Sequence, residues 1–222
     1  MIPLRDTNPS RKVPIVNYIL IATNILVFLF ELSLDADLEK FIYNYGVVPA
    51  YIMNDFRMMS IGVGTIFPLF TSMFLHGGWI HLIGNMLFLY IFGDNVEDRF
   101  GHIRYILFYI IAGVSAAVMQ TIIFPESTAP MVGASGAIAG VLGAYVFMFP
   151  QAKVVTLIPI FLFFQIVELP AFIFLGIWFI MQIFSGIFSL GIGADAGGVA
   201  WWAHIGGFLA GVIMLPFLRK RS

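Results

Sequence analysis

Long apolar runs, separated by short polar segments, occupy most of the chain. A helix needs about 20 mostly apolar residues to cross the hydrocarbon core of a bilayer. The pattern therefore predicts an all-α fold, a polytopic membrane helix bundle that forms a single domain over residues 1–222. The six predicted transmembrane helices, numbered one to six below, are 14–33, 79–93, 104–124, 132–149, 169–189 and 200–218.

Composition supports this interpretation and narrows the function classes. Of the 222 residues, 60% are hydrophobic and only 10% are charged, a balance that no soluble domain of this size shows. Eleven basic residues nearly balance twelve acidic ones, so net charge indicates neither a nucleic acid nor an acidic partner. The lack of cysteine excludes disulfides, thiol catalysis and cysteine-bound metal.

The distribution of basic residues predicts the orientation of the bundle, because short loops rich in Lys and Arg stay in the cytoplasm. Six crossings leave only Lys40 and Arg57 outside, and both termini are then cytoplasmic. The apolar stretch 154–168, broken by Pro159, is predicted to be a cytoplasmic interfacial connection. Segment 35–78 is predicted to be a long external loop that lies partly in the membrane interface.

Polar side chains recur near the external ends of the second, fourth and sixth predicted helices. His81 and Asn85 share one helix face, Ser135 begins the fourth helix, and His204 lies near the start of the sixth. Polar groups are costly in hydrocarbon, so these four should face the bundle interior or a water-filled cavity. Hydrogen bonds that only join helices are the simpler alternative. Glu97, just beyond the inner end of the second helix, is predicted to cap a helix end or to form an ion pair at the inner interface. Asn17 on the first helix is predicted to form a hydrogen bond that packs helices together.

Small residues on the fourth and sixth helices predict that these two helices approach closely. Both carry a GxxxG spacing, which lets helix backbones come together in a membrane and would bring His204 to Ser135. The glycines concerned are Gly136, Gly140, Gly207 and Gly211.

The position of Ser135 also suggests chemistry. It follows Gly133 at the amino end of a helix, where free N–H groups and the helix dipole stabilise an anion. A serine nucleophile, a histidine base and an anion site are the parts needed for acyl transfer.

Three motifs carry a resemblance that spans nearly the whole chain. HGGWIHLIGN (76–85) fits HxxxxHxxxN, GASG (133–136) fits GxSG, and AHIGGFLAG (203–211) fits AHxxGxxxG. In their order and spacing, the sequence resembles the rhomboid intramembrane serine proteases of the minimal six-helix prokaryotic type.

The resemblance implies a role for each motif residue. Ser135 would be the nucleophile and His204 the general base and acid, in a dyad without a carboxylate. His81, Asn85 and the Ser135 N–H would bind the oxyanion, and His76 would be a structural support. The helix at 169–189 would be the lateral gate. Substrates would be transmembrane proteins cleaved near the external face of the cell membrane, with no cofactor or metal; the oligomeric state is left open.

Two departures from the family pattern concern the surroundings of these residues. Phe67-Pro68 stands where many members carry Trp-Arg, which leaves the conformation of the external loop open. Ala139 stands where some members place an aromatic ring against the catalytic histidine, which leaves open how His204 is held. Asp195 is a weak candidate for a third catalytic residue, because the glycines after it indicate a flexible loop.

Two other function classes remain as alternatives. A small transporter is expected to bind its substrate near the midplane between repeated halves, whereas this polar cluster is shallow and no repeat is visible. A non-catalytic rhomboid-like protein that binds membrane helices would not require both Ser135 and His204. A zinc protease is disfavoured because the sequence has no HExxH motif.

Overall fold

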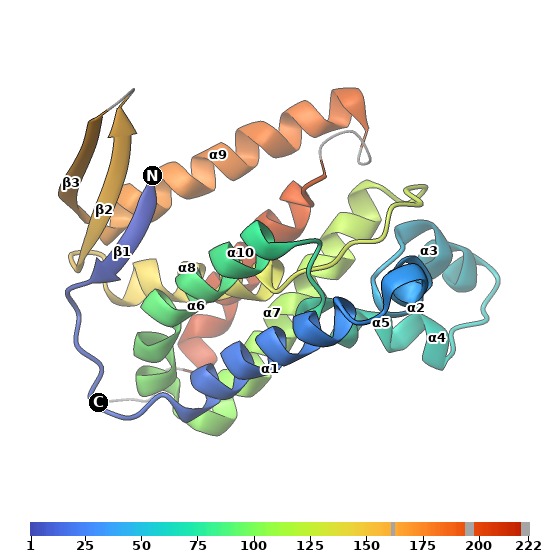
Figure 1. Cartoon of the computed structure of the whole chain (residues 1–222), viewed down its shortest axis with the longest axis horizontal. Coiled ribbons are helices and arrows are strands. Elements are labelled where there is room, and N and C mark those ends of the chain that lie inside the picture. The colour runs from blue at the N-terminus through green and yellow to red at the C-terminus, as the bar shows by residue number, and fades with distance from the viewer. Residues whose placement is uncertain (161–162, 194–197, 219–222) are drawn as a thin grey trace.

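The structure is a computed structural model of the chain that describes residues 1–160, 163–193 and 198–218. It is mostly helical, and each of the six predicted runs contains one long helix (Figure 1). These helices are α1 (Ile15–Glu31), α6 (Trp79–Phe100), α7 (His102–Ile123), α8 (Ser135–Met148), α9 (Ala171–Ile192) and α10 (Trp201–Leu218).

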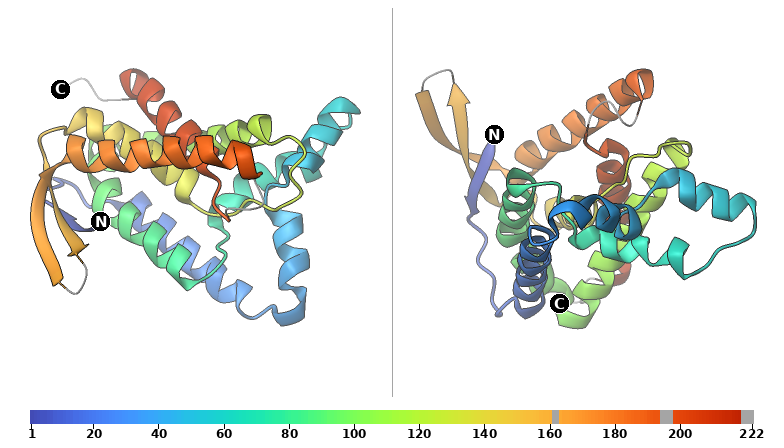
Figure 2. Two further views of the ribbon diagram at one scale, coloured as in Figure 1. Left: turned by 90° about the horizontal axis from the view of Figure 1, so that it is seen from above. Right: turned by 45° about the vertical axis from the view of Figure 1, so that its right-hand side comes forward.

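Helix α8 lies at the centre of the bundle. It packs against α10, α7 and α6, and α10 also packs against α7 (Figure 2). Every residue from Gly136 to Tyr145 is buried, which agrees with a helix that is apolar on all sides. Helix α9 lies along the outside of this group, and its most apolar window is only 28% buried, against 44% for α7.

Membrane-spanning capacity differs among the helices. Among the described residues, α7, α9 and α10 are long and apolar enough to cross a bilayer, which makes this an integral membrane protein. Two bent pairs would raise the number to five, with bends of 110° after α1 and 79° before α6. Helix α8 is apolar but has only 14 residues.

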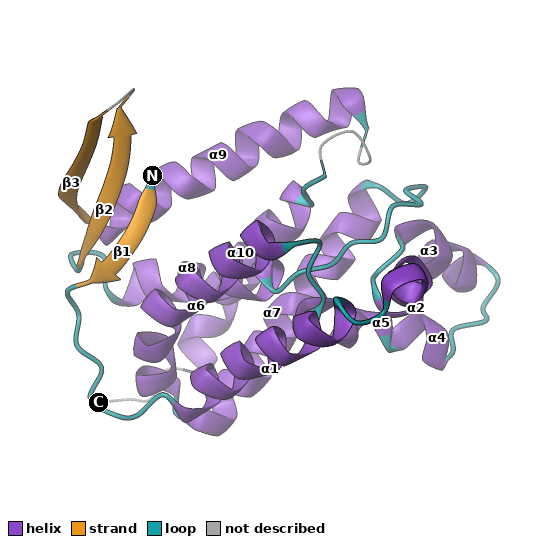
Figure 3. Ribbon diagram, in the orientation of Figure 1, coloured by secondary structure: helices purple, strands orange, loops and turns teal. Residues whose placement is uncertain are grey.

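A small β-sheet corrects the all-α prediction (Figure 3). Strand β1 (Ile2–Asp6) pairs antiparallel with β2 (Lys153–Ile160), which pairs antiparallel with β3 (Phe163–Pro170). The predicted interfacial connection 154–168 supplies most of strands β2 and β3. Its β-branched residues favour strands, and Pro159 lies beyond the Ile2↔Leu157 pair that ends the β1 ladder, an edge position where sheets tolerate proline.

The segment between α1 and α6 folds into short helices at the end of the molecule away from the sheet (Figure 1). Thr71 Oγ1 donates to the Tyr45 carbonyl, and an isolated bridge pairs Val47 with Met131 in the loop before α8. Phe67-Pro68 forms the junction of α4 and α5, where Pro68 occupies a first-turn position that suits proline. The short helices are η1 (Asp35–Asp37), α2 (Leu38–Tyr45), α3 (Pro49–Arg57), α4 (Val63–Ile66), α5 (Pro68–Thr71) and η2 (Ser72–Phe74).

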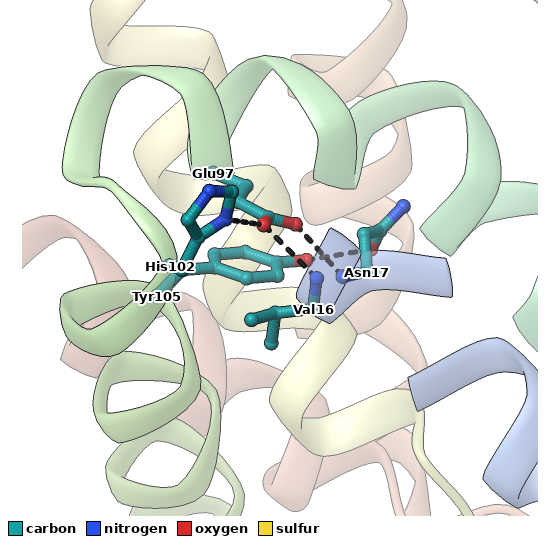
Figure 4. A network of polar contacts seen from close by, with 5 residues as sticks. All are labelled: Val16, Asn17, Glu97, His102 and Tyr105. Carbon is teal, nitrogen blue, oxygen red and sulfur yellow. Dashed lines mark hydrogen bonds and ion pairs between the residues drawn. The ribbon is translucent and has the colours of Figure 1, made fainter. Parts of the chain in front are cut away.

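Glu97 caps the amino end of α1 from a neighbouring helix (Figure 4). Its two carboxylate oxygens accept from the N–H groups of Val16, at 3.0 Å, and Asn17, at 2.7 Å. Pro14 at the N-cap offers no side-chain acceptor, so Glu97 satisfies donors that would otherwise be unpaired. The Tyr105 hydroxyl donates to Asn17 Oδ1 at 2.8 Å, and His102 Nδ1 lies 2.5 Å from Glu97.

Replacing Glu97 by glutamine should therefore destabilise the fold. The side chain keeps its size, but one acceptor oxygen becomes an NH₂ group that faces a backbone N–H. Glu97 is only 1% exposed, so we expect the free energy of unfolding to fall by about 1–3 kcal/mol. The measurement is the unfolding transition of the purified protein in detergent.

Glu126→Gln is the matched control for this substitution. Glu126 pairs with Arg57 at 2.7 Å, but its side chain is 73% exposed. Exposed ion pairs contribute about 0–1 kcal/mol, so this variant should unfold close to wild type. An equal loss in both variants would contradict the capping role of Glu97.

Candidate active site

Ser135 and His204 form a hydrogen bond across two helices. The Ser135 Oγ and His204 Nε2 atoms are 2.8 Å apart. Ser135 is the first residue of α8, and His204 lies in the first turn of α10. A hydroxyl at this distance from an imidazole nitrogen can pass it a proton, which is the geometry of an activated nucleophile.

Direct contact between glycine backbones holds α8 against α10. A methyl group added to Gly207 would overlap the carbonyl oxygen of Gly136, and one added to Gly211 would overlap that of Gly140. The structure therefore has the close approach that the two GxxxG spacings predict. Because no side chain separates the helices, their spacing directly sets the distance from His204 to Ser135.

A cavity of about 860 Å³ opens beside this pair. Helices α6, α8, α9 and α10 and the loop before α8 all contribute to its wall. Its polar lining includes His81, Asn85, Ser135 and His204. The volume lies within the usual range for small-molecule sites, so part of an extended peptide has room next to the serine.

His81 directs an N–H group into the cavity. Its Nδ1 accepts a weak hydrogen bond from the Gly77 N–H at 3.4 Å, which leaves the proton on Nε2 in the neutral ring. A methyl group on Gly133 would lie 2.7 Å from this Nε2. Gly133 has a φ of +129°, in the range that favours glycine. The glycine thus meets both a backbone and a packing requirement next to His81.

Asn85 supplies a second donor. It is 7% exposed, and its Nδ2 finds no acceptor within the described part of the chain. The N–H of Ser135 belongs to the first turn of α8, where helical N–H groups lack intrahelical acceptors. His81, Asn85 and Ser135, which carry these three donors, therefore line the same cavity, and donors of this kind can stabilise a developing oxyanion.

His76 contacts α1 through its main chain. Its backbone N–H donates to the buried carboxylate of Glu31, at 3.2 and 3.3 Å. The rings of His76 and His81 pack edge to face with their centroids 5.1 Å apart. These contacts connect α1 to the start of α6.

Three further residues contact the dyad region and were not identified from the sequence. Gln182 Oε1 lies 2.8 Å from His204 Nδ1, and the Trp178 ring lies 6.1 Å from the imidazole, centroid to centroid. Gln120 on α7 accepts from the Ala203 N–H at 3.2 Å. A single glutamine in the apolar run 171–192 was the available signal, since polar groups within a membrane span usually face the protein interior. Asp195, the weak third candidate, lies outside the described residues.

A family model described as a Rhomboid domain matches residues 63–221, which is most of the chain. The matched region includes all three motifs and begins after α1. The chain belongs to the rhomboid family.

Curated relatives carry the same family name. RHOMBOID-like protein 4 of Arabidopsis thaliana is 32% identical over 146 residues, which are 63% of this chain and 31% of that protein. Rhomboid protease GluP of Bacillus subtilis (strain 168) is 32% identical over 136 residues, 61% of this chain and 25% of that protein. RHOMBOID-like protein 6, mitochondrial, of Arabidopsis thaliana is 43% identical over 76 residues, 34% and 24% of the two chains. The aligned regions thus cover less than a third of each relative's length.

The glycine contact in this rhomboid chain gives a stability prediction. Gly207→Ala forces α10 away from α8, and overpacking of this kind typically costs about 1–3 kcal/mol. We expect a lower thermal unfolding midpoint in detergent. Gly176→Ala on α9 is the control, because a methyl group there would meet nothing within 4 Å. Equal midpoints for the two variants would show that the contact does not limit stability.

Proposed function

We propose that this protein is an intramembrane serine endopeptidase that uses a Ser135–His204 dyad. The observation that carries the proposal is the 2.8 Å hydrogen bond between these side chains, at a helix amino end and beside a cavity. Membership of the rhomboid family and the similarity to a bacterial rhomboid protease support it.

The proposed reaction proceeds in two stages. The Ser135 oxygen attacks the carbonyl carbon of the scissile bond while its proton passes to His204 Nε2. The oxyanion that forms accepts hydrogen bonds from His81 Nε2, Asn85 Nδ2 and the Ser135 N–H. Collapse breaks the C–N bond, and His204 returns the proton to the leaving amine. Water, activated by the same imidazole, then hydrolyses the acyl-enzyme and restores the serine.

The proposed substrates are transmembrane proteins. We propose that α1, α6 and α8 complete six crossings with α7, α9 and α10, and that both termini are cytoplasmic. The basic residues expected inside then include Arg5 and Lys153 at the sheet. The site would lie near the external face, with α9 as the gate through which a substrate helix enters. Cleavage near the external end of a substrate span is the expected outcome.

Removing either member of the dyad should abolish the reaction. Ser135→Ala and His204→Ala are each expected to lower peptide cleavage by about 10⁴-fold or more, because nucleophile and base act as a unit. The assays are labelling of the detergent-solubilised protein with a fluorophosphonate probe and, on separate unlabelled samples, cleavage of a transmembrane substrate. If Ser135→Ala is labelled as strongly as wild type, Ser135 is not the nucleophile.

The same variants, tested also for helix binding and for solute transport, separate the alternative functions. A non-catalytic relative would bind a transmembrane helix but would neither take the probe at Ser135 nor cut the substrate. A transporter would move a solute across vesicles in the Ser135→Ala variant as well as in wild type. Either result would replace the protease assignment.

Asn85→Ala should slow catalysis without disrupting the dyad. Loss of one oxyanion donor typically costs about 10²–10³ in kcat, and Asn85 Nδ2 forms no hydrogen bond with the described residues that would be lost. The measurements are kcat and KM for substrate cleavage. Asn24→Ala is the control, since Asn24 is also buried but donates to Leu20 O within α1 and does not line the cavity. A kcat for Asn85→Ala equal to that of Asn24→Ala would contradict the donor role.

A further inference from the structure

The second nitrogen of the His204 ring is also occupied, by a residue from α9. His204 Nδ1 lies 2.8 Å from Oε1 of Gln182, a residue that is only 5% exposed. Helix α9 otherwise lies at the outside of the bundle (Figure 1). The imidazole on α10 is therefore hydrogen-bonded through Nε2 to Ser135 of α8 and through Nδ1 to Gln182 of α9.

The amide of Gln182 can take only one orientation. Its Nε2 donates to the Trp178 carbonyl oxygen at 3.0 Å, one turn earlier in the same helix. A carbonyl oxygen only accepts hydrogen bonds, so the NH₂ group must face Trp178 and Oε1 must face His204. An amide oxygen also only accepts, and His204 Nδ1 must therefore carry the proton. Nε2 is then left unprotonated, with its lone pair directed at the Ser135 hydroxyl.

Two indole rings surround the same imidazole. The Trp178 ring lies at 6.1 Å with an interplanar angle of 31°, and the Trp201 ring lies at 6.0 Å and nearly perpendicular, at 87°. Ala139, fully buried on α8, contributes only a methyl group. Apart from the Ser135 hydroxyl, the described contacts of the ring therefore come from α9 and from its own helix.

We propose that Gln182 is a positioning residue that fixes the tautomer and the orientation of His204. It takes the place that a carboxylate occupies in a catalytic triad, where the third group holds the imidazole so that its other nitrogen can act as base. A neutral amide provides the same direction without placing a charge in the membrane. The proposal rests on the proposed protease function. Its consequence is that His204 is aligned only while α9 packs against α10 with the bond from His204 to Gln182 intact.

Gln182→Leu tests this role, because leucine fills a similar volume without an acceptor. We expect the rate of fluorophosphonate labelling and kcat for substrate cleavage to fall about tenfold, the upper end for loss of one neutral hydrogen bond, with KM little changed. Gln182→Glu keeps an oxygen at the same reach and should restore most of the rate. Ser189→Ala is the matched control. Ser189 lies two turns further along α9, and within the described part of the chain its hydroxyl bonds only to the Gly186 carbonyl.

Nitrogen NMR of the histidine rings tests the contact independently of activity. The chain has four histidines, so the His204 signals can be assigned by comparison with His204→Ala. Wild type should show a single neutral tautomer with the proton on Nδ1, and Gln182→Leu should show a mixture. A proton on Nε2 in wild type would overturn the proposal.

The two proposals fail in different ways. If Ser135→Ala loses labelling while Gln182→Leu labels at the wild-type rate, Gln182 does not position the base although the protease stands. If Ser135→Ala labels like wild type, the protease assignment fails, and the nitrogen spectra still decide whether Gln182 sets the His204 tautomer. A rate for Gln182→Leu no lower than that of Ser189→Ala would also contradict the positioning role.

Discussion

The contact between the glycine backbones of α8 and α10 is the constraint on which the site depends. In a bilayer the lipid is as apolar as the helix surface, so close van der Waals packing takes over much of the role that burial has in water. Gly136 and Gly140 face Gly207 and Gly211 with no room for a methyl group. Main-chain contact therefore fixes the separation between the backbones of Ser135 and His204, and side-chain orientation sets the remaining distance between hydroxyl and imidazole.

Buried polar groups are treated differently at the two ends of α6. At one end, the Glu97 carboxylate accepts from two N–H groups at the start of α1 and contacts His102. At the other end, Asn85 keeps an Nδ2 donor without an acceptor in the described part of the protein. A buried donor of this kind costs about 1–3 kcal/mol when nothing accepts from it. An oxyanion in front of Ser135 would supply the missing acceptor, which supports the proposed reaction.

Apolar run length and glycine spacing were enough to predict the long helices and the contact between α8 and α10. The sheet was beyond such local patterns, because β1 and β2 lie about 150 residues apart in the chain and their pairing depends on how the bundle brings them together. The site divides in the same way. Motif spacing predicted that His204 meets Ser135, whereas the partner of the other imidazole nitrogen comes from α9, whose rotation about its axis no motif specifies.

The attachment of the start of α9 to the loop between α8 and β2 has a mechanical consequence. Its first turn is pinned, since the N–H of Ala171 donates to Ala152 O and that of Phe172 to Pro150 O. A helix held at one end can pivot about that end, and Gln182 lies about 16 Å from the first residue of α9 at 1.5 Å per residue. A tilt of about 10° about the pinned end would carry Gln182 about 3 Å, by the same helix geometry, enough to break its bond to His204. Among the described residues, two side-chain hydrogen bonds join this part of α9 to α10, from His204 Nδ1 to Gln182 Oε1 and from Trp202 Nε1 to Gly186 O. The imidazole proposed as the base therefore also helps to hold α9 in place.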